Sequence, residues 1–157
     1  MSWITGGRPA DFGQLIGLRP NLAADLAAFS TELWQGHGVD ALTLELCRLR
    51  IAALHGSAAD CARRTPQALA AGLDEDHVAR LPDWHRDPAF GARARACIAL
   101  AEQFVLDPSG VDDAMIGTVR AELGEAATVT LLEALAIFDG FTRFAVLLQA
   151  APEGVAA

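Results

Sequence analysis

Most of the side chains that could do chemistry gather in one short polar stretch, HGSAADCARRT, which begins at His55. Cys61 is a thiol nucleophile, and the neighbouring arginines could lower its pKa. Asp60, and Glu45 in the segment before it, are carboxylates that could act as general bases. Arg64 has the planar guanidinium that holds both oxygens of a carboxylate ligand. The stretch therefore offers thiol, acid–base or anion-binding chemistry.

Each of these residues also has a structural interpretation, which we favour. Glu45 would form an ion pair with Arg48 or Arg64 rather than act as a base with a raised pKa. Asp60 and Arg64 are four residues apart, the spacing of an intrahelical ion pair that contributes about 0.2–0.5 kcal/mol. Cys61 would pack as a small core residue of an alanine-rich helix.

Two further chemistries receive little support. His55 and Ser57 are two residues apart, so on a helix they do not face each other, and no nucleophile-elbow motif surrounds them. A metal site made of Glu45, His55 and Asp60 lacks a recognised ligand spacing, so we expect neither a metal nor a cofactor. The candidate catalytic residues are Glu45, Asp60 and Cys61, and the candidate substrate-binding residues are His55, Ser57 and Arg64.

The composition describes an acidic, apolar chain. It has 157 residues, a net charge of −8 and 52% hydrophobic residues. A negative chain repels phosphate backbones and anionic lipids, which argues against nucleic acid and membrane partners. The most apolar segment, 128–148, is interrupted by charged residues, and the N-terminus has no signal-peptide pattern, so we expect a cytoplasmic protein. The apolar excess favours a homo-oligomer, and three scattered cysteines favour reduced thiols.

The hydrophobic pattern predicts an all-α fold, with a single helical domain of about six helices over residues 21–150. Residues 1–20 are expected to form an N-terminal arm and residues 151–157 a tail. Asn21 would cap the first helix. In the second, the apolar stripe of the buried face would consist of Leu42, Leu46, Leu49 and Ala53, and Arg48 would lie off it. The remaining helical segments are expected at 57–71, 74–81, 87–106, 111–124 and 126–148.

Pro66 interrupts the helical segment that carries the polar stretch. Inside a helix it would cost about 3 kcal/mol. Thr65 as the cap, with Pro66 at the first helical position, avoids that cost. A break at Thr65 is therefore expected.

Three segments together resemble the carboxymuconolactone decarboxylase and alkylhydroperoxidase D-like family. They are LELCRLRIAALHG from Leu44, AAGL from Ala70, and AIFDGFTRF from Ala136. The resemblance covers about residues 42–148 and implies an all-α subunit of a trimer or hexamer, with a dimer as the alternative. Family members often act as thiol peroxidases.

The resemblance also shows where this chain departs from the redox members. They carry a glutamate, then C-x-x-C, then a histidine one turn later. Aligning Glu45 with the family glutamate places Ser57 and Asp60 at the cysteine positions and Arg64 at the histidine position. Cys61 lies one residue past the second position, about 100° round a helix, so it does not substitute directly.

Three hypotheses remain open. The first is a divergent member that has lost thiol chemistry and uses a helical pocket for a small organic acid or lactone. The second is a residual one-cysteine hydroperoxide reductase that uses Cys61. The third is a non-catalytic oligomeric binding protein.

Overall fold

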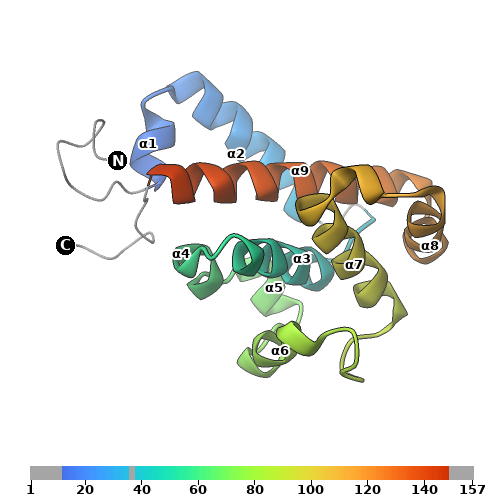
Figure 1. Cartoon of the computed structure of the whole chain (residues 1–157). Helices are drawn as coiled ribbons and strands as arrows, with labels where there is room; N and C mark the ends of the chain where they lie inside the picture. Colours follow the sequence, from blue (N-terminus) through green and yellow to red (C-terminus); the bar gives the residue numbers. More distant parts are fainter. Residues whose placement is uncertain (1–11, 36–37, 149–157) are drawn as a thin grey trace.

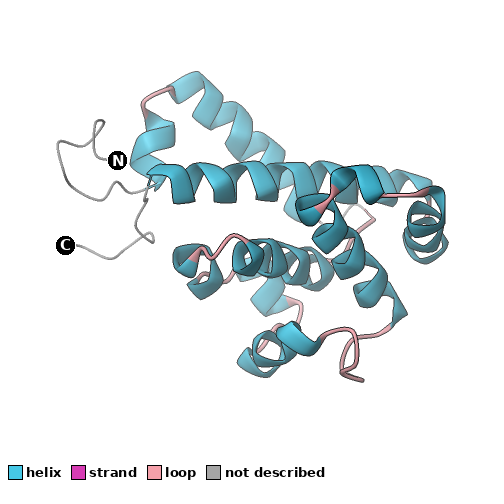
Figure 2. Ribbon diagram, viewed as in Figure 1, coloured by secondary structure: helices cyan, strands magenta, loops and turns pink. Residues whose placement is uncertain are grey.

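The computed structural model describes residues 12–35 and 38–148, and all regular structure in these ranges is helical (Figure 2). The N-terminal part comprises α1 (Phe12–Gly17), α2 (Pro20–Trp34), α3 (Ala41–Leu54), α4 (Ala58–Ala62) and α5 (Pro66–Ala70). The C-terminal part comprises α6 (Glu75–Arg80), η1 (Leu81–Asp83), α7 (Ala92–Leu106), η2 (Pro108–Gly110), α8 (Asp113–Leu123) and α9 (Glu125–Leu148). The all-α prediction is confirmed, with more and shorter helices than the expected six.

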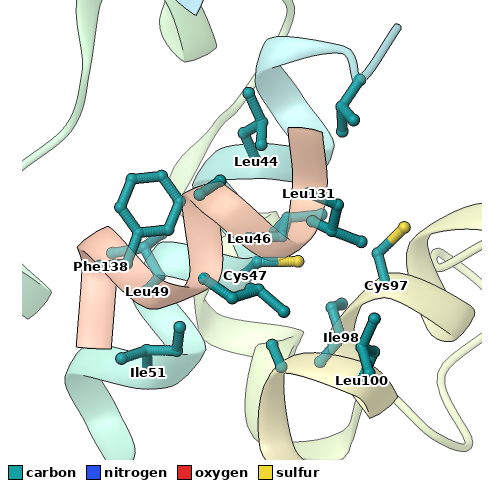
Figure 3. Packing of buried hydrophobic residues seen from close by; sticks show 14 of the residues in the cluster. Leu44, Leu46, Cys47, Leu49, Ile51, Cys97, Ile98, Leu100, Leu131 and Phe138 are labelled. Atoms are coloured by element: carbon teal, nitrogen blue, oxygen red, sulfur yellow. The ribbon is translucent and has the colours of Figure 1, made fainter. Parts of the chain in front are cut away.

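Helix α3 is the central element. It packs against α7 and α9 and also contacts α4 and α5 (Figure 1). Every residue from Thr43 to Leu49 is buried, whereas Ala53, expected on the buried face, is exposed. The prediction of one apolar face was therefore too narrow, because neighbours surround α3 on several sides. Leu44, Ile51, Ile98 and Leu131 are among the fully buried side chains of this core (Figure 3).

Side-chain caps mark the starts of several helices in this chain. Asp40, Thr65, Asp74 and Asp112 each accept a hydrogen bond from a backbone N–H three residues on. Each such cap contributes about 1 kcal/mol. The predicted break at Thr65 is confirmed, since α5 begins at Pro66 directly after its cap.

Two predicted helix starts are wrong. The first long helix begins at Pro20 with Arg19 as its N-cap residue, so Asn21 lies inside it. The helix expected from Asp87 begins at Ala92, because Asp87 instead caps a turn through the N–H of Ala89. That turn buries Phe90 in the core.

Helix α1 lies within the segment expected as an arm, and it packs against the end of α9. The Phe12 ring meets those of Phe141 and Phe144 edge-on, at centroid distances of 5.5 and 6.0 Å. Leu15 and Leu148 are buried together beside them. Residues 1–11 and the expected tail lie outside the described residues. None of the described helices is both long and apolar enough to cross a membrane.

Candidate functional site

A cavity of about 670 Å³ opens between α2, α9 and the segment 59–66. Its size is in the range of small-molecule sites, which are commonly 300–1,000 Å³. Most of the polar stretch singled out from the sequence borders this cavity or lies directly behind it. The cavity is therefore the candidate site.

Behind the cavity, Glu45 is completely buried and fully hydrogen-bonded. Its carboxylate accepts bonds from Arg48 Nε at 2.9 Å and Arg48 Nη2 at 2.6 Å. It also accepts bonds from the N–H of Thr65 at 3.2 Å and from Thr65 Oγ1 at 3.1 Å. Four donors thus occupy its two oxygens, and Glu45 does not line the cavity. The predicted ion pair with Arg48 is confirmed, and Arg64 is not part of it.

Arg48 ties this buried carboxylate to the backbone of the polar stretch. Its Nη1 donates to the carbonyl of Asp60 at 3.0 Å, and its Nη2 donates to the carbonyl of Arg63 at 2.7 Å. Both carbonyls lie at the end of α4, where the regular i+4 donors of a helix are lacking, and that of Asp60 also accepts from the N–H of Arg63 at 3.3 Å. One guanidinium therefore fixes the segment that forms the cavity floor.

Ser57 and Asp60, the residues at the family's cysteine positions, contact each other. Ser57 Oγ donates to Asp60 Oδ2 at 2.7 Å, and it accepts a 3.3 Å bond from the N–H of Asp60 as the cap of α4. Asp60 Oδ1 accepts from Arg63 Nη2 at 3.3 Å. Asp60 and Arg63 line the cavity, whereas Ser57 is buried outside its lining.

The predicted intrahelical pair between Asp60 and Arg64 does not form. Helix α4 ends at Ala62, so the i, i+4 geometry is not reached. Arg64 instead pairs with Glu75 through two hydrogen bonds of 3.0 Å. Arg64 still lines the cavity, whereas its partner Glu75 does not.

The cysteines among the described residues are poorly suited to act as nucleophiles. Burial raises the pKa of the Cys61 thiol, outweighing the lowering effect of Arg48, and Cys61 is not in the cavity lining. Burial also raises the pKa of Cys47 and brings that of Cys97 to about 12. All three are free thiols. A thiol with a raised pKa is mostly protonated near neutral pH and is a poor nucleophile.

His55 belongs to a different contact. Its Nε2 lies 2.6 Å from Asp139 Oδ1, and Asp139 in turn pairs with Arg143 on α9 at 2.9 Å. His55 and Ser57 thus bond to different partners, and His55 is outside the cavity lining. Asp139 and Arg143 have the i, i+4 spacing of an ion pair within one helix.

The sequence interpretation missed the opposite wall of the cavity, which is aromatic. Phe12 from α1, Phe29 and Trp34 from α2, and Phe138 and Phe141 from α9 all line it. Phe138 and Phe141 are three residues apart, the one local signal that they share a helix face. Their meeting with α2 depends on tertiary packing.

The charged residues in the cavity lining are Arg48, Arg63, Arg64 and Asp60. Glu45 and Glu75, which pair with two of these arginines, are not in the cavity lining. Although the chain as a whole has a net charge of −8, this floor therefore presents more positive than negative groups. Among the described residues, no group of His, Cys, Asp or Glu is arranged to hold a metal ion.

A sequence model of the carboxymuconolactone decarboxylase family matches residues 20–103, more than half of the chain. The chain belongs to this family. The match spans α2 to most of α7 and includes the whole polar stretch. A search of curated proteins gives no match by sequence.

Solved structures extend the family's fold over nearly the whole chain. One is a protein of unknown function from Agrobacterium tumefaciens, described as a putative antioxidant defence protein AhpD, with a TM-score of 0.75 at 19% identity. That similarity covers 90% of this chain and 97% of the other. Another is the debrominase Bmp8 without ligand, with a TM-score of 0.78 at 14% identity, covering 98% and 82%. A cysteine-to-alanine variant of Bmp8 in complex with 2,3,4-tribromopyrrole gives 0.75 at 15% identity, covering 94% and 79%.

Proposed function

We propose that this member of the carboxymuconolactone decarboxylase family binds a small organic acid in the cavity and does not reduce peroxides through paired thiols. The observation that carries the proposal is the two-sided lining of the cavity. Its floor carries three arginines and one aspartate, and its opposite wall is apolar and aromatic. An apolar wall with a few convergent polar groups is the usual form of a small-molecule site.

Arg63 is the residue best placed to hold the acid group. Its side chain is 46% exposed, and the one ion pair of its guanidinium among the described residues is the long 3.3 Å contact with Asp60. Arg48 and Arg64 each donate two hydrogen bonds to a glutamate. A ligand carboxylate that binds Arg63 therefore has only the weak contact with Asp60 to displace.

The loss of two-thiol chemistry is supported by the contacts at the cysteine positions. Ser57 and Asp60 hydrogen-bond to each other, and neither is a thiol. Cys61 has a raised pKa and is not in the cavity lining, which argues against the one-cysteine alternative. The remaining carboxylate in the lining is Asp60, and it would be the proton-transfer group if the bound acid reacts.

The similarity to Bmp8 supports a small cyclic ligand. Bmp8 shares the fold, and its variant holds 2,3,4-tribromopyrrole. That protein is named a debrominase, and no such activity is assigned to this chain.

The proposal is tested by calorimetric titration of the protein with cyclohexanecarboxylate, benzoate and their neutral amides. The acids should bind and the amides should bind at least about ten-fold more weakly, because a charged hydrogen bond is lost. Arg63→Gln should weaken acid binding about ten-fold, whereas Arg86→Gln, an exposed arginine outside the lining, should not. Equal binding of acids and amides would refute the proposed acid binding, and hydroperoxide consumption that depends on Cys61 would establish the one-cysteine alternative in its place.

A further inference from the structure

The apolar wall of the cavity is built from paired aromatic rings. Trp34 and Phe138 lie with their ring centroids 5.8 Å apart and their planes inclined by 33°. Phe12 and Phe141 meet edge-on, with centroids 5.5 Å apart and planes at 83°. These two pairs join α2 and α1 to α9, so the rings are held by three separate helices.

Aromatic rings fixed in this way favour one kind of apolar ligand. A ring carries a negative face and a positive edge, and a second ring gains from offset-stacked or edge-to-face contact beyond the burial of its area. A saturated ring of the same size buries at least as much apolar surface but lacks this electrostatic match. Hydrophobic burial alone would therefore not favour the planar ring.

The charges of the floor restrict the acid as well. Arg63 offers a partner for one carboxylate, and Asp60 lies beside it with its own negative charge. A second carboxylate on the ligand would find Arg48 and Arg64 already paired with glutamates. It would also be repelled by the like charge of Asp60. The floor thus suits a single negative charge.

From the paired rings and the adjacent Arg63 we infer that the ligand is a planar aromatic monocarboxylate of one or two rings. Its carboxylate binds Arg63, and its ring lies against Trp34, Phe138 and Phe141. This inference rests on the proposed function, because it names the class of acid that the same cavity takes. A two-ring acid is well within the cavity volume of about 670 Å³.

The test compares 2-naphthoate with its fully saturated analogue, decahydronaphthalene-2-carboxylate, by calorimetric titration. The two share the carboxylate and the carbon skeleton and differ in aromaticity. The native protein should bind 2-naphthoate about three- to ten-fold more tightly. Phe141→Leu and Trp34→Leu should each lower this ratio, because each removes one of the aromatic rings that the ligand contacts.

Phe104→Leu is the matched control. Phe104 is a partly buried phenylalanine of α7 that packs on the core outside the cavity lining, and its replacement should leave the ratio unchanged. Thermal melting of each variant shows whether it is folded. Two independent variants, on α9 and α2, keep the test decisive if one of them does not fold.

The outcomes separate the inference from the proposed function. If the two acids bind equally, aromatic selection is refuted and acid binding stands. The same conclusion follows if the preference for 2-naphthoate is unchanged in both Phe141→Leu and Trp34→Leu. If 2-naphthamide binds as tightly as 2-naphthoate, the proposed recognition of the carboxylate is refuted, whereas selection for an aromatic ring is not. Binding of neither acid overturns both.

Discussion

Replacing Glu45 by glutamine tests whether this residue is structural. Glutamine keeps the shape of the side chain but removes the charge that balances Arg48. It also places an amide donor where Arg48 and Thr65 donate. We expect the folded state to be strongly destabilised.

The magnitude follows from the contacts. Glu45 accepts four hydrogen bonds through its two oxygens, and glutamine has one acceptor oxygen, so two of them are lost. Hydrogen bonds to charged groups contribute about 1.5–3 kcal/mol each, which gives about 3–6 kcal/mol. Breaking a buried ion pair by removing one partner costs about 3–5 kcal/mol. Both routes give a loss of about 4 kcal/mol, a large part of the 5–15 kcal/mol typical of a domain.

The loss is measured by urea unfolding followed by tryptophan fluorescence, as a shift of the midpoint at constant slope. Glu75→Gln is the matched control, because Glu75 also pairs with an arginine but its side chain is 76% exposed. Exposed pairs contribute at most about 1 kcal/mol. The double variant Glu45→Gln with Arg48→Met should lose less unfolding free energy than the two single variants lose in sum, because neither partner is then left buried alone.

A cost below about 1 kcal/mol for Glu45→Gln would refute this reasoning. The carboxylate would then not be the anchor of the polar stretch. If such a variant also lost turnover of a bound acid, Glu45 would have to act as the base that its position in the family suggests.

Three further predictions concern neighbouring residues. Cys61→Ser should leave hydroperoxide consumption unchanged. Because burial raises the pKa of Cys61, its thiol should react with a disulfide reagent no faster than free cysteine at pH 7, and a faster reaction would contradict this. Thr65→Val should cost about 2–4 kcal/mol in urea unfolding, since it removes both the cap of α5 and a donor to Glu45; a cost below about 1 kcal/mol contradicts this. Hydrogen bonds from the backbone and side chain of His77 lower the pKa of Asp74, so its contribution to stability is present at neutral pH and is lost as the pH falls. The unfolding midpoint of Asp74→Asn should therefore fall less than that of the native protein below about pH 4, and parallel pH profiles would contradict this.

The parts of the fold that local signals determine were predictable from the sequence. Thr65 before Pro66 specifies a cap and a first-turn proline, and the structure has both. Gly56 just beyond α3 has φ of 66°, which suits glycine at a helix end. Asp87 before Pro88 carries a similar signal, yet there the chain forms a turn that buries Phe90. Tertiary burial of one aromatic ring outweighed the local preference.

The candidate site was only partly predictable, because its walls come from distant segments. Periodicity placed Arg48 off the apolar stripe of α3, whereas the structure buries its guanidinium between Glu45 and two backbone carbonyls. The i, i+3 spacing of Glu45 and Arg48 indicated their pairing but not the carbonyls. Trp34 and Phe138 meet across more than a hundred residues of sequence, and nothing local predicts that contact.

The anchorage of the cavity floor through Arg48 bears on how this protein can evolve. Arg48 holds the carbonyls of residues 60 and 63, and a carbonyl is present whatever side chain those residues carry. The side chains that face the cavity can therefore be exchanged one at a time while the backbone beneath them keeps its course. Residue 48 itself has no such freedom, because its replacement would release the floor and strand the carboxylate of Glu45. The buried guanidinium of Arg48 thus fixes the backbone that shapes the site, whereas the side chains that determine its chemistry can be substituted.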